Sequence, residues 1–390
     1  MQNVDVLIVG GGMVGLSLAC ALKNTELTVA IVSDVPLSQT LPDSPTVRVS
    51  AINKRNADRL NLLGAWQHIP QSRLCAYTQM AVWDKHSFGR IAFDAADTQT
   101  DNLGHIVENQ ALVNALATEV ASQANVTVTE TTISRILWGD EQTVVMLENN
   151  DAIACKLLVG ADGANSFVRN QAAFPLTFKD YGHTAIVANL RCDEPHGGVA
   201  RQVFTPSGPL ALLPMADPNL VSIVWSQEKD NAAALLGLDD RAFCAALTAT
   251  CNAALGTMAL ATERFHFPLV MRYARQWLKP GGLILGDAAH TIHPLAGQGA
   301  NLGMQDAFAL ADCLRDLEAA GKPFYRYRYL RPWERERKAQ ALKMVAAMEG
   351  FKQLFAGDDP LKKLVRGVGL MATDSLPGVK DRWVAQAMGL

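Results

Sequence analysis

Two aspartates stand directly after short apolar runs that contain a glycine near their ends. Asp162 follows Leu157-Leu158-Val159-Gly160-Ala161 and precedes Gly163, and Asp287 follows Leu283-Ile284-Leu285-Gly286. Runs of this kind predict buried strands, and ligands of open α/β sheets bind at the carboxyl ends of the strands. A carboxylate at such an end can accept a hydrogen bond from a ligand hydroxyl, which contributes about 1.5–3 kcal/mol. We therefore expect both turns to contact one ligand.

The segment after Asp287 combines a stiff loop with the start of a helix. Pro294 fixes one backbone angle, and Gly297 and Gly299 leave backbone amides uncovered where a helix with regularly spaced apolar residues begins. Such amides bind negative charge, with a stabilisation of about 0.3–1 kcal/mol when exposed and up to about 2 kcal/mol when partly buried. A reduced flavin, whose pyrimidine end is negative, suits this position. The alternative is an ordinary glycine-rich connection between a strand and a helix.

The N-terminus carries the fingerprint of a dinucleotide-binding βαβ unit. An apolar run, Val4–Val9, leads into Gly10-Gly11-Gly12-Met13-Val14-Gly15, and a second run follows at Leu27–Val32. Gly10 allows the tight turn, Gly12 the approach of a pyrophosphate, and Gly15 the close packing of helix on strand. A looser match at 367–372 lacks a preceding strand and is set aside.

The fingerprint should end in an acidic residue that binds the ribose, but Ser33 holds that place and Asp34 follows it. Neighbouring strand residues point to opposite faces, so Asp34 can serve only where the strand has ended. We expect weak adenosine recognition from Ser33 or Asp34, which a Ser33→Glu replacement should improve.

Composition indicates an enzyme without a nucleic-acid partner. The 390 residues suffice for about two or three domains. Hydrophobic residues make up 49% and the formal net charge is -3, which does not favour nucleic acid. Seven scattered cysteines without a CxxC pair argue against a disulfide framework or a zinc site. With no long apolar segment and a strand that starts at Val4, we expect a cytoplasmic protein.

Taken together, these motifs resemble those of the single-component flavin-dependent aromatic hydroxylases, and within them the ubiquinone-biosynthesis hydroxylases. The likeness covers nearly the whole chain, and Val82-Trp83-Asp84-Lys85 and 374–380 are most similar to the branch that hydroxylates a polyprenylphenol at ring position 5. The motifs that carry the resemblance are Gly10 to Gly15, Arg48, Gly160-Ala161-Asp162-Gly163, Gly286-Asp287-Ala288-Ala289-His290 and Gly297-Gln298-Gly299-Ala300-Asn301-Leu302-Gly303.

The resemblance implies non-covalent FAD, NAD(P)H as a transient reductant, and oxygen transfer to a phenol through a flavin 4a-hydroperoxide. It also implies glycines on the pyrophosphate, Arg48 near the cofactor and Asp287 on the ribityl chain. The catalytic loop beside the flavin ring would include Pro294, Gly297, Gln298 and Gly299. The cofactor-binding residues would be Gly10, Gly12, Gly15, Ser33 or Asp34, Arg48, Asp162, Gly163, Asp287, Pro294, Gly299, Ala300 and Asn301.

We expect an α/β fold with a discontinuous Rossmann-like FAD-binding domain at 1–75, 100–175 and 278–340. A mainly antiparallel sheet at 76–99 and 176–277 would form the substrate domain, and 341–390 a C-terminal helical segment. Apolar strands in the substrate domain predict a pocket that includes Leu213, Pro214 and Trp225.

The expected partners are a hydrophobic prenylated phenol and dioxygen. His290 and His293 lack a third ligand, so no metal site is expected. Peripheral contact with the inner membrane, a multi-enzyme ubiquinone-biosynthesis complex and a homo-oligomer remain open. Rival functions are a flavin-dependent dehydrogenase or reductase on the same fold and a non-catalytic flavin-binding assembly subunit.

Overall fold

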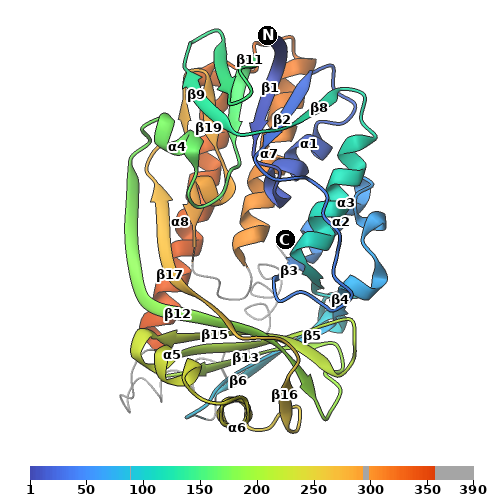
Figure 1. Cartoon of the computed structure of the whole chain (residues 1–390), viewed down its shortest axis with the longest axis vertical. Helices are drawn as coiled ribbons and strands as arrows, with labels where there is room; N and C mark the ends of the chain where they lie inside the picture. Colours follow the sequence, from blue (N-terminus) through green and yellow to red (C-terminus); the bar gives the residue numbers. More distant parts are fainter. Residues whose placement is uncertain (88, 293–297, 356–390) are drawn as a thin grey trace.

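The computed structural model describes residues 1–87, 89–292 and 298–355, which form two large sheets and a small one (Figure 1). The first large sheet has the strand order β18-β19-β11-β1-β2-β8, with β10 and β9 added through β11. Neighbouring strands from β19 to β8 are parallel. The bounds are β1 Gln2–Val9, β2 Val29–Ser33, β8 Val126–Glu130, β9 Ile133–Leu137, β10 Thr143–Leu147, β11 Ala152–Gly160, β18 Leu278–Lys279 and β19 Gly282–Ile284.

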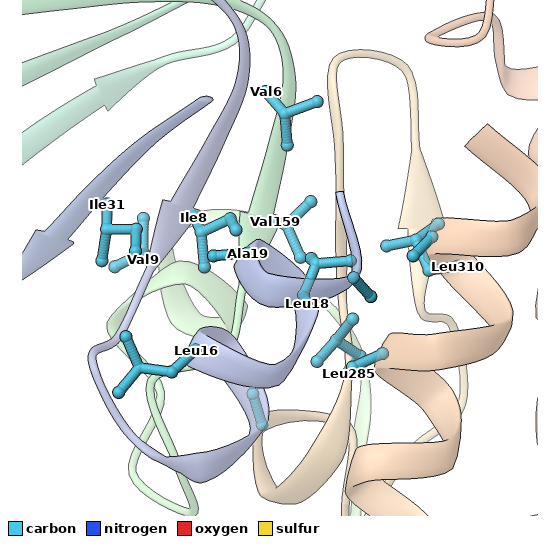
Figure 2. Close-up of a cluster of buried hydrophobic side chains, with 14 of the residues drawn as sticks. Val6, Ile8, Val9, Leu16, Leu18, Ala19, Ile31, Val159, Leu285 and Leu310 are labelled. Carbon is cyan, nitrogen blue, oxygen red and sulfur yellow. The ribbon is translucent and has the colours of Figure 1, made fainter. Parts of the chain in front are cut away.

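Helices cover this parallel sheet, which explains why its central strands are apolar on both faces. Helix α1 (Met13–Ala21) packs against α3 (Asn109–Ala121) and α7 (Gln298–Ala319). Figure 2 shows Leu16 and Leu18 of α1 among strand residues, with Leu310 of α7 beside Leu285. All four side chains are fully buried, and the expected Rossmann-like core is confirmed.

The second large sheet is mainly antiparallel and lies at the other end of the molecule (Figure 1). Its order is β20-β17-β12-β15-β14-β13-β5-β6, with β16 beside β12. The β13–β5 pairing is parallel, whereas the others are antiparallel. The bounds are β5 Gln79–Asp84, β6 Arg90–Asp94, β12 Leu176–Cys192, β13 Val199–Thr205, β14 Gly208–Pro214, β15 Leu220–Glu228, β16 Met258–Leu260, β17 Phe265–Ala274 and β20 His290–Thr291.

The two faces of this sheet have different neighbours. The outer face packs on helices α5 (Lys229–Leu236) and α6 (Asp240–Thr250), with Phe243 at the centre of the contact. The inner face is turned toward the other domain, where Leu213 packs in a cluster with Ala51 and Ile106. Alternation along each strand therefore decides which side chains border the rest of the protein.

A small antiparallel sheet and several short helices connect the two domains. The small sheet is ordered β3-β7-β4. The remaining bounds are β3 Val49–Asn53, β4 Leu74–Tyr77, β7 Gly104–Glu108, α2 Lys54–Leu62, α4 Phe167–Gln171, and the 3-10 helices η1 Trp66–His68, η2 Gln71–Arg73, η3 Ala95–Thr98 and η4 Gly286–Ala288.

Helix α8 (Tyr327–Phe355) runs along both domains. The domain boundary expected at residue 341 falls inside this continuous helix, because its apolar residues keep contact with α7 and the large sheet. The rest of the expected C-terminal helical segment, 356–390, lies outside the described residues. Among those that are described, no helix has both the length and the apolar content needed to span a bilayer.

Candidate functional site

A glycine cradle lies between β1 and α1. Gly10 has a φ of +113°, and a Cβ there would lie 2.4 Å from the carbonyl oxygen of Ala161. A Cβ at Gly15 would lie 2.1 Å from the carbonyl oxygen of Gly10, so only glycine permits this helix-to-strand contact. A Cβ at Gly12, in contrast, meets nothing within 4 Å. Open space at the N-terminus of α1, where backbone N–H groups lack helical partners, suits a pyrophosphate.

Ser33 ends strand β2, and its hydroxyl already has a hydrogen-bond partner within the protein. Its hydroxyl donates a hydrogen bond of 2.7 Å to the carbonyl oxygen of Val35, and the side chain is buried. A Cβ at Gly11 would lie 2.1 Å from Cδ2 of Leu37, so Leu37 fills the space beside this strand end. Asp34 lies beyond the strand and is exposed. The only donor of the Ser33 hydroxyl is therefore used within the protein and the side chain is buried, whereas Asp34 is accessible.

Arg48 is exposed at the end of the loop 42–48, which is fixed by hydrogen bonds with Glu108 and Arg73. Glu108, 1% exposed, accepts hydrogen bonds of 2.9 Å from the backbone and hydroxyl of Thr46. Arg73 lies 3.3 Å from Glu108 and donates to the carbonyl oxygen of Pro42 at 2.5 Å. No described residue forms an ion pair with Arg48, so its guanidinium can neutralise a phosphate.

A cavity of about 500 Å³ lies next to Glu108 and Arg73. Its lining includes Asp43, Arg73, Glu108 and Asp217, none of which is a predicted site residue. The cavity is rich in carboxylates, and we do not assign the flavin to it.

The turn η4 presents Asp287. Gly286 has a φ of +59° and packs against Val14 of α1, which brings the turn close to the glycine cradle. The Asp287 side chain is exposed, yet the protein around it desolvates the carboxyl and raises its pKa, an effect opposed by the charges of His290 and Arg272. No described group donates a hydrogen bond to this carboxylate. It can accept one from a ligand hydroxyl.

A buried network that the sequence analysis missed supports this turn from below. Asp306 of α7 accepts hydrogen bonds from Nε2 of His290 at 2.5 Å, from Nε of Arg337 at 2.7 Å and from the Gly286 amide at 3.2 Å. Burial alone would raise the pKa of Asp306, but His290 and Arg337 outweigh it and lower that pKa. Helix α8 is thereby linked to the turn that carries Asp287. The sequence held one signal for this network: Asp306 lies at helical spacing among the apolar residues Leu302, Phe308 and Leu310, and a buried charge needs partners.

This network also assigns His290 a structural partner. We expected no metal site at His290 and His293; His293 lies outside the described residues. Within the described ranges, no group of three or more His, Cys, Asp or Glu side chains is placed to hold a metal ion.

Asp162 lies in the turn before α4 and is engaged by the protein. It accepts hydrogen bonds from the Ser166 hydroxyl at 2.5 Å and from the Val168 amide at 3.0 Å. Arg169, buried in the same helix, donates to the carbonyl oxygen of Ala288 at 3.0 Å. The two glycine-aspartate turns are therefore joined, as one shared ligand site requires, although Asp162 itself shapes the turn. Gly163, with a φ of +79°, has open space where a Cβ would be.

The start of α7 is anchored by Asn301. Its Nδ2 donates to the carbonyl oxygen of Ala51 at 2.6 Å, and its Oδ1 accepts from the Asn53 amide and from Nδ2 of Asn56, both at 2.9 Å. The side chain is 1% exposed, and the backbone carbonyl of Asn301 also accepts a hydrogen bond from Nδ2 of Asn56 at 3.1 Å, so Asn301 holds the start of α7 in place. Gly299 and Ala300 share the first turn, where amides are unpaired in the helix.

Part of the predicted catalytic loop lies outside the described residues, namely Pro294 and Gly297. Gln298 begins α7, and its side chain is not among the described parts of the structure.

The three predicted substrate residues do not share one face. Leu213 lies on the inner face, whereas Trp225 packs against Phe243 of α6 on the outer face, with ring centroids 5.8 Å apart. The expectation of Trp225 as a pocket residue is corrected, because strand alternation directs it into the outer core. Pro214 is buried at the end of β14.

The parallel sheet, its glycine cradle and the antiparallel sheet beside it define a dinucleotide-binding flavoprotein. A family profile described as "FAD binding domain" matches residues 3–346, and the chain belongs to this family. The predicted cofactor, FAD, is confirmed, and the chain is an FAD-dependent monooxygenase, for which NAD(P)H is the typical reductant.

Two relatives match almost end to end. The "3-demethoxyubiquinol 3-hydroxylase" of Escherichia coli (strain K12) is 33% identical over 392 residues, covering 100% of this chain and 99% of the relative. The "Ubiquinone biosynthesis monooxygenase COQ6, mitochondrial" of Danio rerio is 32% identical over 433 residues, covering 98% and 89%. The crystal structure of p-nitrophenol 4-monooxygenase PnpA from Pseudomonas putida DLL-E4 has a similar fold, with a TM-score of 0.79 at 17% identity over 100% and 99% of the two chains.

Proposed function

We propose that this monooxygenase hydroxylates the aromatic ring of a polyprenylphenol in ubiquinone biosynthesis. The observation that carries the proposal is the end-to-end similarity to two proteins named for ubiquinone biosynthesis or for a demethoxyubiquinol substrate.

The residues around the cradle fit FAD. Backbone amides at the start of α1 would bind the pyrophosphate above Gly12, and Arg48 would balance its charge. Asp287 would accept a hydrogen bond from a ribityl hydroxyl, because its carboxylate is exposed and has no described donor. The free amides of Gly299 and Ala300 would face the pyrimidine end of the ring.

Bound FAD would supply the redox chemistry, taking reducing equivalents from NAD(P)H and activating dioxygen for attack on the ring. The protein would orient the phenol and exclude water. Leu213 on the inner face would border the ring of the substrate, whereas Pro214, the next residue of the strand, pairs with Val221 of the outer-face cluster. Pro294, Gly297, Gln298 and Gly299 would form the loop beside the flavin ring.

The lipid-like tail of such a substrate resides in a bilayer, and we include peripheral contact with the inner membrane in the proposal. The formal net charge of -3 gives no general attraction to an anionic surface. Contact would therefore depend on apolar side chains rather than on overall charge.

Deletion of the gene tests this function in the cell. The expected result is loss of ubiquinone and accumulation of a prenylphenol that lacks one ring hydroxyl, identified by mass spectrometry. Restoration by the wild-type gene but not by an Asp287→Ala variant would assign the defect to the flavin site. Normal ubiquinone levels in the deletion strain would contradict the proposal. A rival assembly role predicts that an FAD-free variant still restores ubiquinone.

A further inference from the structure

Two exposed phenylalanines lie on the inner face of the mainly antiparallel sheet, at the edge formed by β17. Phe265 and Phe267 are 47% and 41% exposed, which is unusual for two aromatic residues at alternate positions of one strand. Strand β20 pairs with β17 only at Arg272 and Tyr273, so in the described part of the chain Phe265 and Phe267 occupy a free edge.

The neighbouring residue fixes the direction of these side chains. Arg264 lies over the ring of Phe243 on α6, 5.0 Å from its centroid, and therefore points to the outer face. Because alternate residues point to opposite faces, Phe265 and Phe267 point to the inner face. They pair with Val187 and Ala185 of β12, which lie on the same face.

This aromatic pair is continuous with the region proposed to hold the substrate ring. Two residues beyond Val187, Asn189 donates hydrogen bonds of 3.1 and 3.2 Å to the carbonyl oxygens of Pro45 and Thr46, in the loop that leads to Arg48. Asn189 pairs with Ser222, and Ser222 pairs with Leu213. The inner face therefore connects Leu213 with the edge through neighbouring strands.

We infer that Phe265 and Phe267 bind the isoprenoid tail of the substrate where it leaves the protein. This inference rests on the proposed function. The two rings present apolar surface, and their row continues without a charged residue through the buried Val187 to Val224, which packs in one cluster with Val345 of α8. Such a row fits a hydrocarbon chain better than an anionic headgroup or an acidic peptide.

The geometry also predicts which part of the tail is bound. Three strand spacings separate β14, which carries Leu213, from β17, a distance of about 14 Å. At roughly one strand spacing for each isoprene unit, about three units reach the aromatic pair. A substrate with one unit should not contact Phe265 or Phe267.

The test compares monoprenyl and triprenyl phenols in detergent solution, with the wild type, a Phe265→Ser/Phe267→Ser double variant and a Leu137→Ser control. Leu137 is 43% exposed but lies on β9 of the other sheet. We expect the double variant to raise KM for the triprenyl phenol about tenfold, from the lost burial of two partly exposed rings, and to leave kcat unchanged. In the double variant, KM for the monoprenyl phenol should change less than about twofold. In the Leu137→Ser control, KM for either phenol should change less than about twofold.

Several results would overturn the inference. Equal changes for both tail lengths would mean that the pair does not contact the tail of the substrate. Unchanged KM values with weaker sedimentation on phospholipid vesicles would assign the pair to membrane docking instead. Wild-type protein that hydroxylates neither phenol would refute the proposed function itself, and this inference with it. A Phe265→Leu/Phe267→Leu variant, which keeps apolar surface, should retain most of the triprenyl affinity.

Discussion

Nε2 of His290 lies 2.5 Å from Oδ2 of Asp306, at the buried centre of a network that links helices α7 and α8 to the turn that carries Asp287. The other carboxylate oxygen of Asp306, Oδ1, accepts a hydrogen bond from Nε of Arg337. The network connects α8, distant in sequence, to the proposed ribityl contact. A disturbance of α8 should therefore reach the cofactor without any direct contact.

Arg337→Met should lower the free energy of unfolding by about 3–5 kcal/mol, because it leaves the Asp306 carboxylate buried with one partner fewer. FAD affinity should fall in parallel as the Gly286 turn loses its support. Urea unfolding and fluorescence titration of the apoprotein with FAD would measure the two effects. Arg335→Met is the matched control, since Arg335 is exposed on the same helix. If both variants behave alike, the network does not position the turn.

Asp287→Asn should make the apoprotein more stable at neutral pH while weakening FAD binding. Desolvation raises the pKa of Asp287 above its ordinary value of 3.8. A carboxyl whose folded pKa is raised stabilises the fold below the unfolded pKa and costs stability as the pH rises. Asparagine removes that cost but replaces a charged acceptor with a neutral one. A variant less stable than the wild type at neutral pH would contradict this account.

The same shift predicts how FAD binding depends on pH. Because the charged carboxylate is the better acceptor, affinity should begin to fall on acidification at a pH higher than an ordinary aspartate would give. Asp287→Asn should lack this component of the pH profile. An identical profile in both proteins would assign the titration to another group.

Ser33→Glu alone should not give the tighter FAD binding that the sequence predicts. The Ser33 side chain is buried, and Leu37 fills the space beside Gly11 that a longer side chain needs. The double variant Ser33→Glu/Leu37→Ala should bind FAD about tenfold more tightly, if the full charge increment of about 1.4 kcal/mol is realised. Unchanged affinity in the double variant would show that Asp34 or another group already binds the ribose.

Much of the fold follows from local patterns. The glycine spacing from Gly10 to Gly15 and the apolar runs before Asp162 and Asp287 predict the parallel sheet, because each pattern reflects contacts within a few residues. The resemblance supplied FAD, which the family match supports, and the class of reaction, which the named relatives support.

The long-range contacts could not be predicted in the same way. Trp225 was placed in the pocket because its strand is apolar on both faces, and periodicity alone does not say which face meets α6. Asn301 was read as part of a glycine-rich helix start and Asp306 was not singled out, while their partners Asn56 and Arg337 lie far away in the sequence. Such contacts depend on topology.

The most direct test of the account follows the oxygen atom. Purified protein is incubated with NAD(P)H, a triprenyl phenol and isotopically labelled dioxygen, and the product is analysed by mass spectrometry. Incorporation of one labelled atom into the new ring hydroxyl is the predicted result, and omission of the phenol should leave NAD(P)H oxidation slow. A hydroxyl oxygen that came from water, or equal product under strict anoxia, would contradict the monooxygenase mechanism and favour a dehydrogenase.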